Sequence, residues 1–228
     1  MDYIKTHEGN TNVAQIAGVV ACVPTLSHQV EGENFYEFRV DVERLSGIKD
    51  TIPVTISERT LANFSVEVGK FVKVCGEYRS YNKLTGEKSK LVLHLFAKEI
   101  EIGGEGYLNE VRLTGFICKT PIYRKTPFDR EICDVLLAVN RTNYHKSDYI
   151  PCILWGRNAR FISQQNIGCK VEIVGRIQSR QYNKVLENGE VETKTAYEVS
   201  CQRIALLSNI TPLSSSEDSA KNVLISDV

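Results

Sequence analysis

The sequence lacks the features that mark membrane proteins, metal proteins and disulfide-rich proteins. Its 228 residues contain no apolar run approaching the roughly 18 residues of a membrane span, and residues 1–12 are polar rather than signal-like. The seven cysteines never form a CxxC pair, and the four histidines are scattered. We therefore expect a cytoplasmic chain with reduced, packed thiols, no metal site and no cofactor.

Motifs of the common catalytic classes are also missing. There is no HExxH, no P-loop GxxxxGK[ST] and no recognisable pair of catalytic carboxylates. The sequence therefore predicts a protein that is not an enzyme.

The net charge is zero, with 28 Lys and Arg against 28 Asp and Glu, which by itself disfavours a polyanionic partner. The charge is unevenly distributed, however. Residues 1–103 hold 12 basic and 14 acidic residues (net −2), residues 104–207 hold 15 and 11 (net +4), and residues 208–228 hold 1 and 3 (net −2). This asymmetry indicates that the two halves have different tasks.

An internal repeat explains the division into halves. Matching residues recur at offsets that grow slowly from 97 (Asn12 and Asn109, Arg44 and Arg141), through 98 (Asp50 and Asp148), to 99 (Gly76 and Gly175). Because the offset changes only in polar segments, the pattern indicates a duplicated domain with loop insertions.

Each repeat shows alternating apolar stretches typical of β-strands, with one short helical stretch ended by a glycine. The expected strands are 13–23, 35–44, 50–57, 71–81 and 91–100 in the first repeat, and 111–118, 133–141, 148–155, 170–182 and 196–206 in the second; the expected helices are 58–66 and 157–165. This order predicts an all-β chain of two tandem OB-fold five-stranded barrels, each with a helix between strands 3 and 4. The predicted domains are 1–103 and 104–207, followed by a disordered tail, 208–228.

The second repeat resembles a known family through four blocks taken together: NEVRLTGFICKTP, LLAVNR, DYIPCILWGRNA and GCKVEIVGRIQSRQY. It closely resembles the bacterial single-stranded-DNA-binding protein family from Asn109 to about Leu207, and more faintly from Asn12 to Ile100. The resemblance implies non-catalytic OB-folds that stack bases on aromatic rings and contact phosphates through Arg and Lys. It also implies assemblies of four OB-folds, which a homodimer of this chain would supply.

Strand alternation separates core from surface in the second repeat. In strand 148–155, Ile150, Cys152 and Leu154 share the core parity, whereas Tyr149, Pro151, Ile153 and Trp155 face outward. The stacking positions of the family fall on Tyr149 and Trp155, and a further one falls on Tyr182. The alternative is that a partner subunit or the other repeat covers this face.

The next strand predicts a cationic track on the same face. Val171, Ile173 and Ile177 have the core parity, and Arg176, Gln178, Arg180 and Tyr182 the outward one, unless a bulge intervenes; a merely solvated strand is the alternative. Further candidates for nucleic-acid binding are Arg141, Tyr144, Arg157 and Lys184, the first three equally able to serve structural salt bridges, and the loop residues Tyr123, Arg124 and Lys125.

The first repeat keeps the core parity but not the candidate binding residues. Ile52, Val54 and Ile56 are retained, whereas Thr51 and Ser57 replace the two aromatics and Glu77 replaces Arg176. The outward side of strand 35–44 carries Glu37, Arg39, Asp41 and Glu43, and a secondary track of Lys73, Arg79, Tyr81 and Lys83 remains. We therefore expect the second repeat to hold the principal site.

Two further expectations concern partners. The family usually ends in an Asp run with an apolar tip, but this chain ends in SSSEDSAKNVLISDV, so recruitment of replication or repair proteins carries over only weakly. A scaffold of a primosome-like assembly and a single-stranded RNA binder remain alternatives to a DNA binder, because stacking faces accept either backbone.

Overall fold

The fold is all-β, as the sequence predicts. The computed structural model describes residues 3–7, 9–86, 88–142, 146–185 and 189–207. The strands are β1 (Asn12–Val30), β2 (Glu33–Glu43), β3 (Lys49–Ser57), β4 (Phe71–Thr85), β5 (Lys88–Ile102), β6 (Leu108–Ile117), β7 (Ile122–Lys125), β8 (Glu131–Asn140), β9 (Ser147–Trp155), β10 (Lys170–Val185) and β11 (Val191–Leu206). Three short helices are α1 (Tyr3–Thr6), α2 (Glu58–Leu61) and α3 (Gly156–Ser163).

Strand pairing in the first repeat returns to its starting strand. β1 pairs with β2, β2 with β3, β3 with β5, β5 with β4, and β4 again with β1. Only the β3–β5 pair is parallel. Side chains of one parity therefore point into a closed five-stranded ring, and those of the other parity face out.

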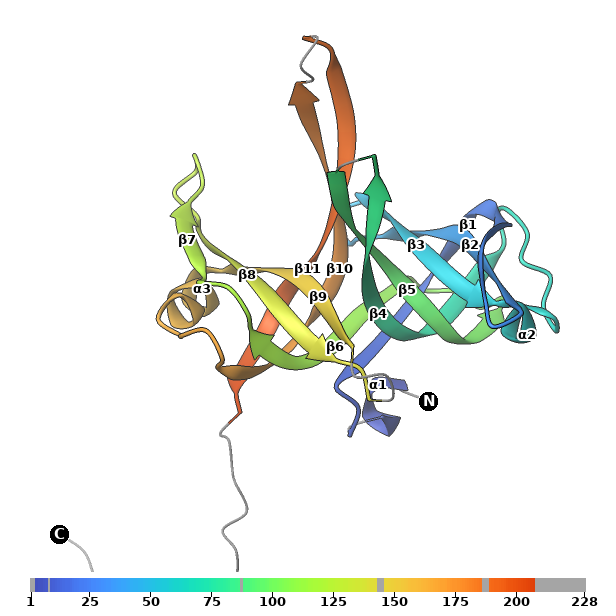
Figure 1. Cartoon of the computed structure of the whole chain (residues 1–228), viewed down its shortest axis with the longest axis horizontal. Coiled ribbons are helices and arrows are strands. Elements are labelled where there is room, and N and C mark those ends of the chain that lie inside the picture. Colours follow the sequence, from blue (N-terminus) through green and yellow to red (C-terminus); the bar gives the residue numbers. More distant parts are fainter. Residues whose placement is uncertain (1–2, 8, 87, 143–145, 186–188, 208–228) are drawn as a thin grey trace, which may run out of the picture.

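The second repeat uses the same order of pairing. β6 pairs with β8, β8 with β9, β9 with β11, β11 with β10, and β10 with β6, again with one parallel pair, β9–β11. β7 adds to the outer edge of β8. The two repeats lie side by side, with the second at the left of Figure 1 and the first at the right.

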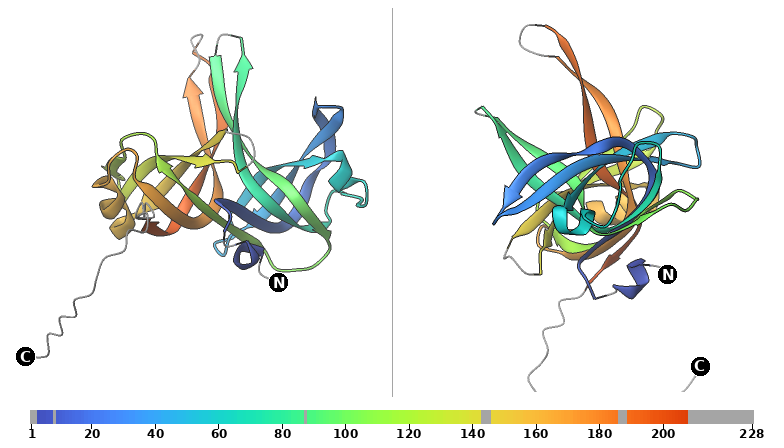
Figure 2. Two further views of the ribbon diagram at one scale, coloured as in Figure 1. Left: turned by 60° about the horizontal axis from the view of Figure 1, so that its bottom comes forward. Right: turned by 90° about the vertical axis from the view of Figure 1, so that its right-hand side faces the viewer.

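A direct strand pair joins the two repeats. β1 and β6 are antiparallel from Asn12 opposite Leu113 to Ala17 opposite Leu108, which makes one eleven-stranded sheet of the whole β structure among the described residues. The β4–β5 and β10–β11 hairpins extend beyond the rings and project from the same side of the molecule (Figure 2).

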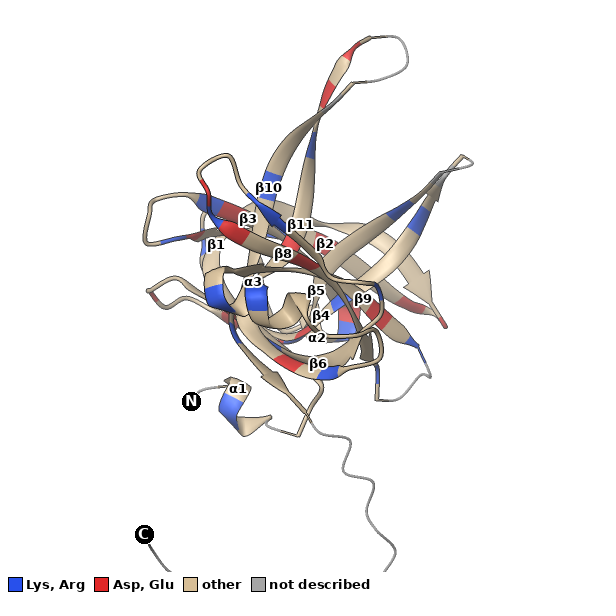
Figure 3. Ribbon diagram, turned by 90° about the vertical axis from the view of Figure 1, so that its left-hand side faces the viewer, with Lys and Arg blue, Asp and Glu red and all other residues tan. Residues whose placement is uncertain are grey.

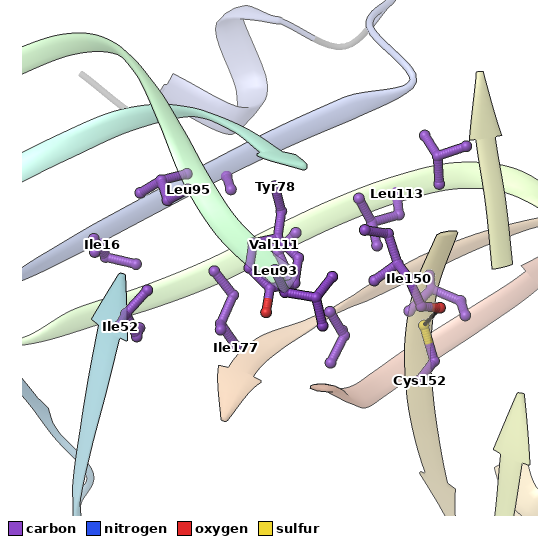
Figure 4. Close-up of a cluster of buried hydrophobic side chains, with 14 of the residues drawn as sticks. Ile16, Ile52, Tyr78, Leu93, Leu95, Val111, Leu113, Ile150, Cys152 and Ile177 are labelled. Carbon is purple, nitrogen blue, oxygen red and sulfur yellow. Dashed lines mark hydrogen bonds between the residues drawn. The ribbon is translucent and has the colours of Figure 1, made fainter. Parts of the chain in front are cut away.

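The hydrophobic core is continuous across the repeats. One cluster contains Ile16, Ile52 and Leu95 of the first repeat together with Leu113, Ile150 and Ile177 of the second (Figure 4). Tyr78 on β4 is completely buried among them, and burial raises its pKa well above its usual value, with Tyr197 and Cys152 of the other repeat contributing. Burying this ring between the repeats ties their stabilities together.

Two glycines allow the rings to close. A Cβ on Gly18 would lie 2.2 Å from the carbonyl oxygen of Asp41, and one on Gly115 would lie 2.5 Å from that of Ala138. Both contacts are with backbone of the neighbouring strand, which cannot move aside. The matching glycines of the repeat are therefore needed for close strand approach.

Two local predictions were wrong. The predicted helix 58–66 ends at Leu61 and leaves the buried Val66 in a loop. The segment of Tyr123, Arg124 and Lys125, predicted as a loop, forms β7, because Ile122–Lys125 pairs with β8. Ile153 has the predicted outer parity of β9, but it is only 6% exposed because it forms the floor of a groove described below. Contacts between segments distant in sequence decide all three outcomes, and strand alternation alone does not predict such contacts.

All seven cysteines are free, as expected, and Cys75, Cys133, Cys152 and Cys201 are buried. Within the described residues, no helix is both long enough and apolar enough to cross a membrane.

Candidate functional site

The outer side of β9 presents two aromatic rings. Tyr149 is 45% exposed and Trp155 39% exposed, whereas Ile150, Cys152 and Leu154 of the opposite parity lie in the core. Tyr149 is held through its backbone N–H, which donates to the Ser80 hydroxyl of the first repeat at 2.7 Å. Neither ring is covered by the other repeat, so both have surface available for stacking.

The outer side of β10 continues this face. Ile177 is buried, whereas Arg180 is exposed and Tyr182 is 40% exposed, with the Arg180 guanidinium 6.0 Å from the Tyr182 ring centre. β10 and β11 pair as a hairpin that contains one β-bulge. The extra, unpaired residue of the bulge is Gln202 on β11, so the side chains of β10 alternate between the two faces without interruption. Arg180 and Tyr182 are exposed as predicted, but Gln178, which shares their parity, is only 8% exposed.

A groove of about 420 Å³ joins the two strands. Ile132 and Ile153 are its buried apolar residues, and Gln178 donates to Glu198 at 2.7 Å within it. The groove is lined by Arg44, Arg124, Thr126, Ile132, Ile153, Trp155, Arg176, Gln178, Ser179, Arg180 and Glu198. Four of the predicted residues thus meet in one concave surface: Trp155, Arg176, Arg180 and Arg124.

Arg44 is a member of this groove that the sequence did not indicate, because it belongs to the first repeat. Its guanidinium donates to both oxygens of the buried Asp50, at 2.7 and 2.6 Å. Asp50 in turn accepts from the backbone N–H of Ser179 on β10 at 2.7 Å. Only the pairing between repeats places Arg44 here, and the repeat offset does not reveal that pairing.

Arg141 has the corresponding position in the second repeat and serves the structure. It donates to both oxygens of Asp148, at 2.8 and 2.6 Å, and Asp148 is fully buried. Asp148 also accepts from the backbone N–H of Ser80 at 2.6 Å. Of the two roles that the sequence left open for Arg141, the structural ion pair is the one its contacts support.

The candidates on β7 are each engaged with a carboxylate. Tyr123 donates to Glu131 at 2.6 Å, which raises its pKa; Arg124 donates to Asp134 at 2.9 Å; and Lys125 donates to Asp129 at 2.9 Å. These pairs are exposed, so each is weak and a competing phosphate can replace the carboxylate. Arg157 is exposed on α3, and Figure 3 shows Lys and Arg on both α3 and β10 on this side of the molecule.

The secondary track of the first repeat follows β4. Arg79 is largely buried and pairs with Glu77 at 2.6 Å. Tyr81 is 42% exposed, and its ring meets the His94 ring edge to face, with the ring centres 5.5 Å apart. Lys73 is half-buried and Lys83 is exposed. Glu77 also lies 3.5 Å from Lys98. Glu77 therefore partly neutralises the charges of Arg79 and Lys98.

Other aromatic rings on the first repeat were not predicted. Phe35 on β2 stacks on His28 at 5.0 Å, Phe96 on β5 lies 5.9 Å from Phe35, and the Arg79 guanidinium covers Phe96 at 3.7 Å. A search for outward aromatics on every strand, rather than on the third and fourth alone, would have found them. Two predicted residues remain without a structural account: Tyr144 and the Lys184 side chain lie outside the described part of the chain.

A closed β-barrel whose outer strands carry half-exposed aromatics beside arginines is the arrangement of OB-fold modules that bind single-stranded nucleic acid. Comparison with known proteins agrees with this class. Residues 108–207 match the single-strand binding protein family, and the single-stranded DNA-binding protein 3 of Streptococcus agalactiae serotype V is 31% identical over 106 residues, 44% of this chain and 74% of that relative. The chain belongs to the single-strand binding protein family.

Two further comparisons set the extent of the likeness. The single-stranded DNA-binding protein 1 of Staphylococcus aureus (strain COL) is 34% identical over 106 residues, which are 44% of this chain and 61% of the relative. The crystal structure of the wild-type single-stranded DNA binding protein from Thermus aquaticus has a TM-score of 0.69 at 21% identity, over 90% of this chain and 96% of the other. That likeness supports the fold over both repeats, beyond the segment that the family match covers.

Proposed function

We propose that this chain binds single-stranded DNA without catalysing a reaction, as a member of the replication, recombination or repair machinery. The observation that carries the proposal is the groove of the second repeat, where Trp155 lies among Arg176, Arg180 and Arg124 on an apolar floor. The names of the curated relatives, all single-stranded DNA-binding proteins, support the choice of DNA. The RNA alternative is tested by comparing oligo-dT with oligo-U of equal length.

Each side chain has a definite task in this proposal. Bases stack on Trp155, Tyr149 and Tyr182, and every stacked base contributes about 1–3 kcal/mol regardless of its identity. Arg176, Arg180 and Arg157 contact phosphates, so binding weakens steeply with salt as counterions are released. Ring stacking and phosphate contacts do not read base edges, so this mode of binding is sequence-tolerant.

The proposed organisation is two OB-fold modules in tandem, residues 1–103 and 104–207, with unequal shares in binding. The second module holds the principal site. In the first, Thr51 and Ser57 stand at the positions of Tyr149 and Trp155, and Glu77 pairs with Arg79. Lys73, Tyr81 and Lys83 then form a weaker track. Two chains would present four modules, so we also propose a homodimer, which light scattering would show as twice the mass of one chain.

The test of DNA binding uses the single tryptophan of the chain. Titration with oligo-dT at low salt should quench Trp155 fluorescence, and the effect should reverse when salt is added. A folded protein whose fluorescence does not respond to oligo-dT would rule the proposal out.

The division of labour is tested with variants and a labelled oligo-dT. Trp155→Ala and Tyr182→Ala should each weaken binding about 5- to 150-fold, the range that corresponds to 1–3 kcal/mol, whereas Tyr81→Ala should weaken it less. Fluorescence anisotropy of the labelled strand measures all three. Equal losses in all three variants would show that the two modules share binding evenly.

A further inference from the structure

Two hollows lie at related positions where the repeats meet. The first, the arginine pocket, has a volume of about 770 Å³ and is lined by Val42, Glu43, Arg44, Leu45, Ser46, Tyr107, Leu108, Asn109, Arg176 and Gln202. The second, the glutamate pocket, has a volume of about 230 Å³ and is lined by Asn10, Thr11, Asn12, Glu77, Asn140, Arg141 and Thr142. In each pocket, a turn between two strands of one repeat lies beside the first residues of the other repeat.

The repeat relates the two pockets residue by residue. Arg44 corresponds to Arg141 (141 − 44 = 97) and Asn12 to Asn109 at the same offset. The pockets differ in their central charge, because Arg176 stands where the other pocket has Glu77 (176 − 77 = 99). The duplication has therefore reversed the charge at one position of the hollow.

Arg176 has hydrogen-bonding capacity that the protein does not use. Its Nε is enclosed and has no partner among the described residues, and its Nη2 makes only a long bond of 3.4 Å to Gln178. Burial lowers the pKa of Arg176, and the nearby Arg44 charge lowers it further. The weak bond of Nη2 leaves this nitrogen able to donate a stronger, charge-assisted hydrogen bond to a phosphate oxygen.

The arginine pocket is continuous with the DNA-binding groove. Arg44 and Arg176 line both hollows, so Trp155 and Arg180 lie on one side of this arginine pair and Tyr107 and Leu45 on the other. Glu43 is the one carboxylate among the pocket's lining residues, and Tyr107 is 45% exposed. Because Arg44 is paired with Asp50, Arg176 is the cation that a strand following the groove meets on its way to the first repeat.

We propose that the sugar–phosphate backbone of a bound single strand leaves Trp155, passes over Arg176, and enters the arginine pocket, where Tyr107 receives a base. The strand thus crosses between the repeats on this side only. The glutamate pocket does not take part, because it is smaller and has Glu77 at the position of Arg176, while its Arg141 is paired with Asp148. This path rests on the proposed function and specifies which surface beyond the second repeat contacts the strand.

A matched pair of charge insertions tests the path. Leu45 and Thr142 are both exposed, belong to corresponding turns and line the arginine and glutamate pockets respectively. Leu45→Glu and Thr142→Glu therefore add the same charge at related positions with little effect on folding. Binding of a short oligo-dT of about 8 nucleotides and a long one of about 30, both labelled, is measured by anisotropy over a range of salt concentrations.

Leu45→Glu should weaken binding of the long strand about 3- to 10-fold and reduce its salt slope by about 0.7, the value for one phosphate contact of a single strand. It should leave the short strand unchanged, and Thr142→Glu should leave both unchanged. Equal effects of the two insertions, or no effect of Leu45→Glu on the long strand, would overturn the path.

Arg176→Gln, with Glu77→Gln as its matched control, tests the cation itself. Arg176→Gln should lower both the affinity and the salt slope for the long strand, and Glu77→Gln should not lower either. An unchanged salt slope in Arg176→Gln would also overturn the path. If the wild-type protein fails to bind even the short strand, the proposed function fails; if short-strand binding and Trp155 quenching are normal, only the path is at stake.

Discussion

Asp50 and Asp148 show how a single residue can serve both the fold and the site. Each is fully buried, accepts two bonds from an arginine of its own repeat and caps a backbone N–H on the other repeat. Breaking such a pair leaves a charge enclosed without a partner, which costs more than the pair itself contributes. These carboxylates therefore hold β10 and β4 in the positions from which their outward residues reach solvent.

Asp148→Ala should lower the free energy of unfolding by about 3–5 kcal/mol, because Arg141 and the Ser80 N–H both lose their acceptor. Urea denaturation followed by Trp155 fluorescence measures the change. Asp134→Ala is the control: it removes the exposed pair with Arg124 and should cost less than about 1 kcal/mol. A loss as small as that of the control would contradict the role given to Asp148.

His94 gives the protein a pH-dependent stability. Burial lowers its pKa to about 4, and the Arg79 charge acts in the same direction. Because the unfolded chain binds a proton at His94 near pH 6.5 and the folded chain does not, stability should fall as pH drops from about 6.5 to about 4, by up to about 1.4 kcal/mol per unit. The thermal midpoint of His94→Gln should depend less on pH over this interval; an unchanged dependence would assign it to other groups.

At the scale of the elements, the sequence predicts strands well and connections poorly. Alternation identified the buried residues Ile52, Val54 and Ile150 correctly, because a period of two is a local property. It could not identify β7, whose four residues are exposed and are strands only through their pairing with β8. The same limit hid Phe96 and the groove floor at Ile153, which become binding or packing residues only when neighbouring strands are known.

The tip of the β10–β11 hairpin should contribute to binding without contributing to the core. None of the described residues between Tyr182 and its partner Lys194 belongs to the hydrophobic cluster. Replacing residues 183–193 by an Asn-Gly turn should therefore keep the unfolding midpoint and weaken oligo-dT binding. The matched shortening of the β4–β5 hairpin, at residues 83–90, should weaken binding less. If the first replacement unfolds the protein, the hairpin has a structural role that its burial does not indicate.

For the molecule as a whole, the repeats are joined by a relation close to twofold symmetry. Asn12 lies opposite Leu113, and Asn109 lies opposite Ile16, the residue that corresponds to Leu113. The offset of the repeat predicts that these residues correspond. It does not predict that β1 and β6 pair, because correspondence between copies carries no information about how they pack.

This packing should make the chain unfold as one unit. β1–β6 pairing, the two cross-repeat aspartates and the shared burial of Tyr78 all have to break before either repeat can open. Trp155 fluorescence reports the second repeat and far-UV circular dichroism reports both, and the two urea transitions should coincide. A fragment of residues 104–207 should unfold at lower urea than the full chain, because it lacks the β1–β6 pairing and the bond from the Ser179 N–H to Asp50. Separate transitions in the full chain, or a fragment as stable as the whole, would show that the interface contributes little and that each repeat is stable by itself.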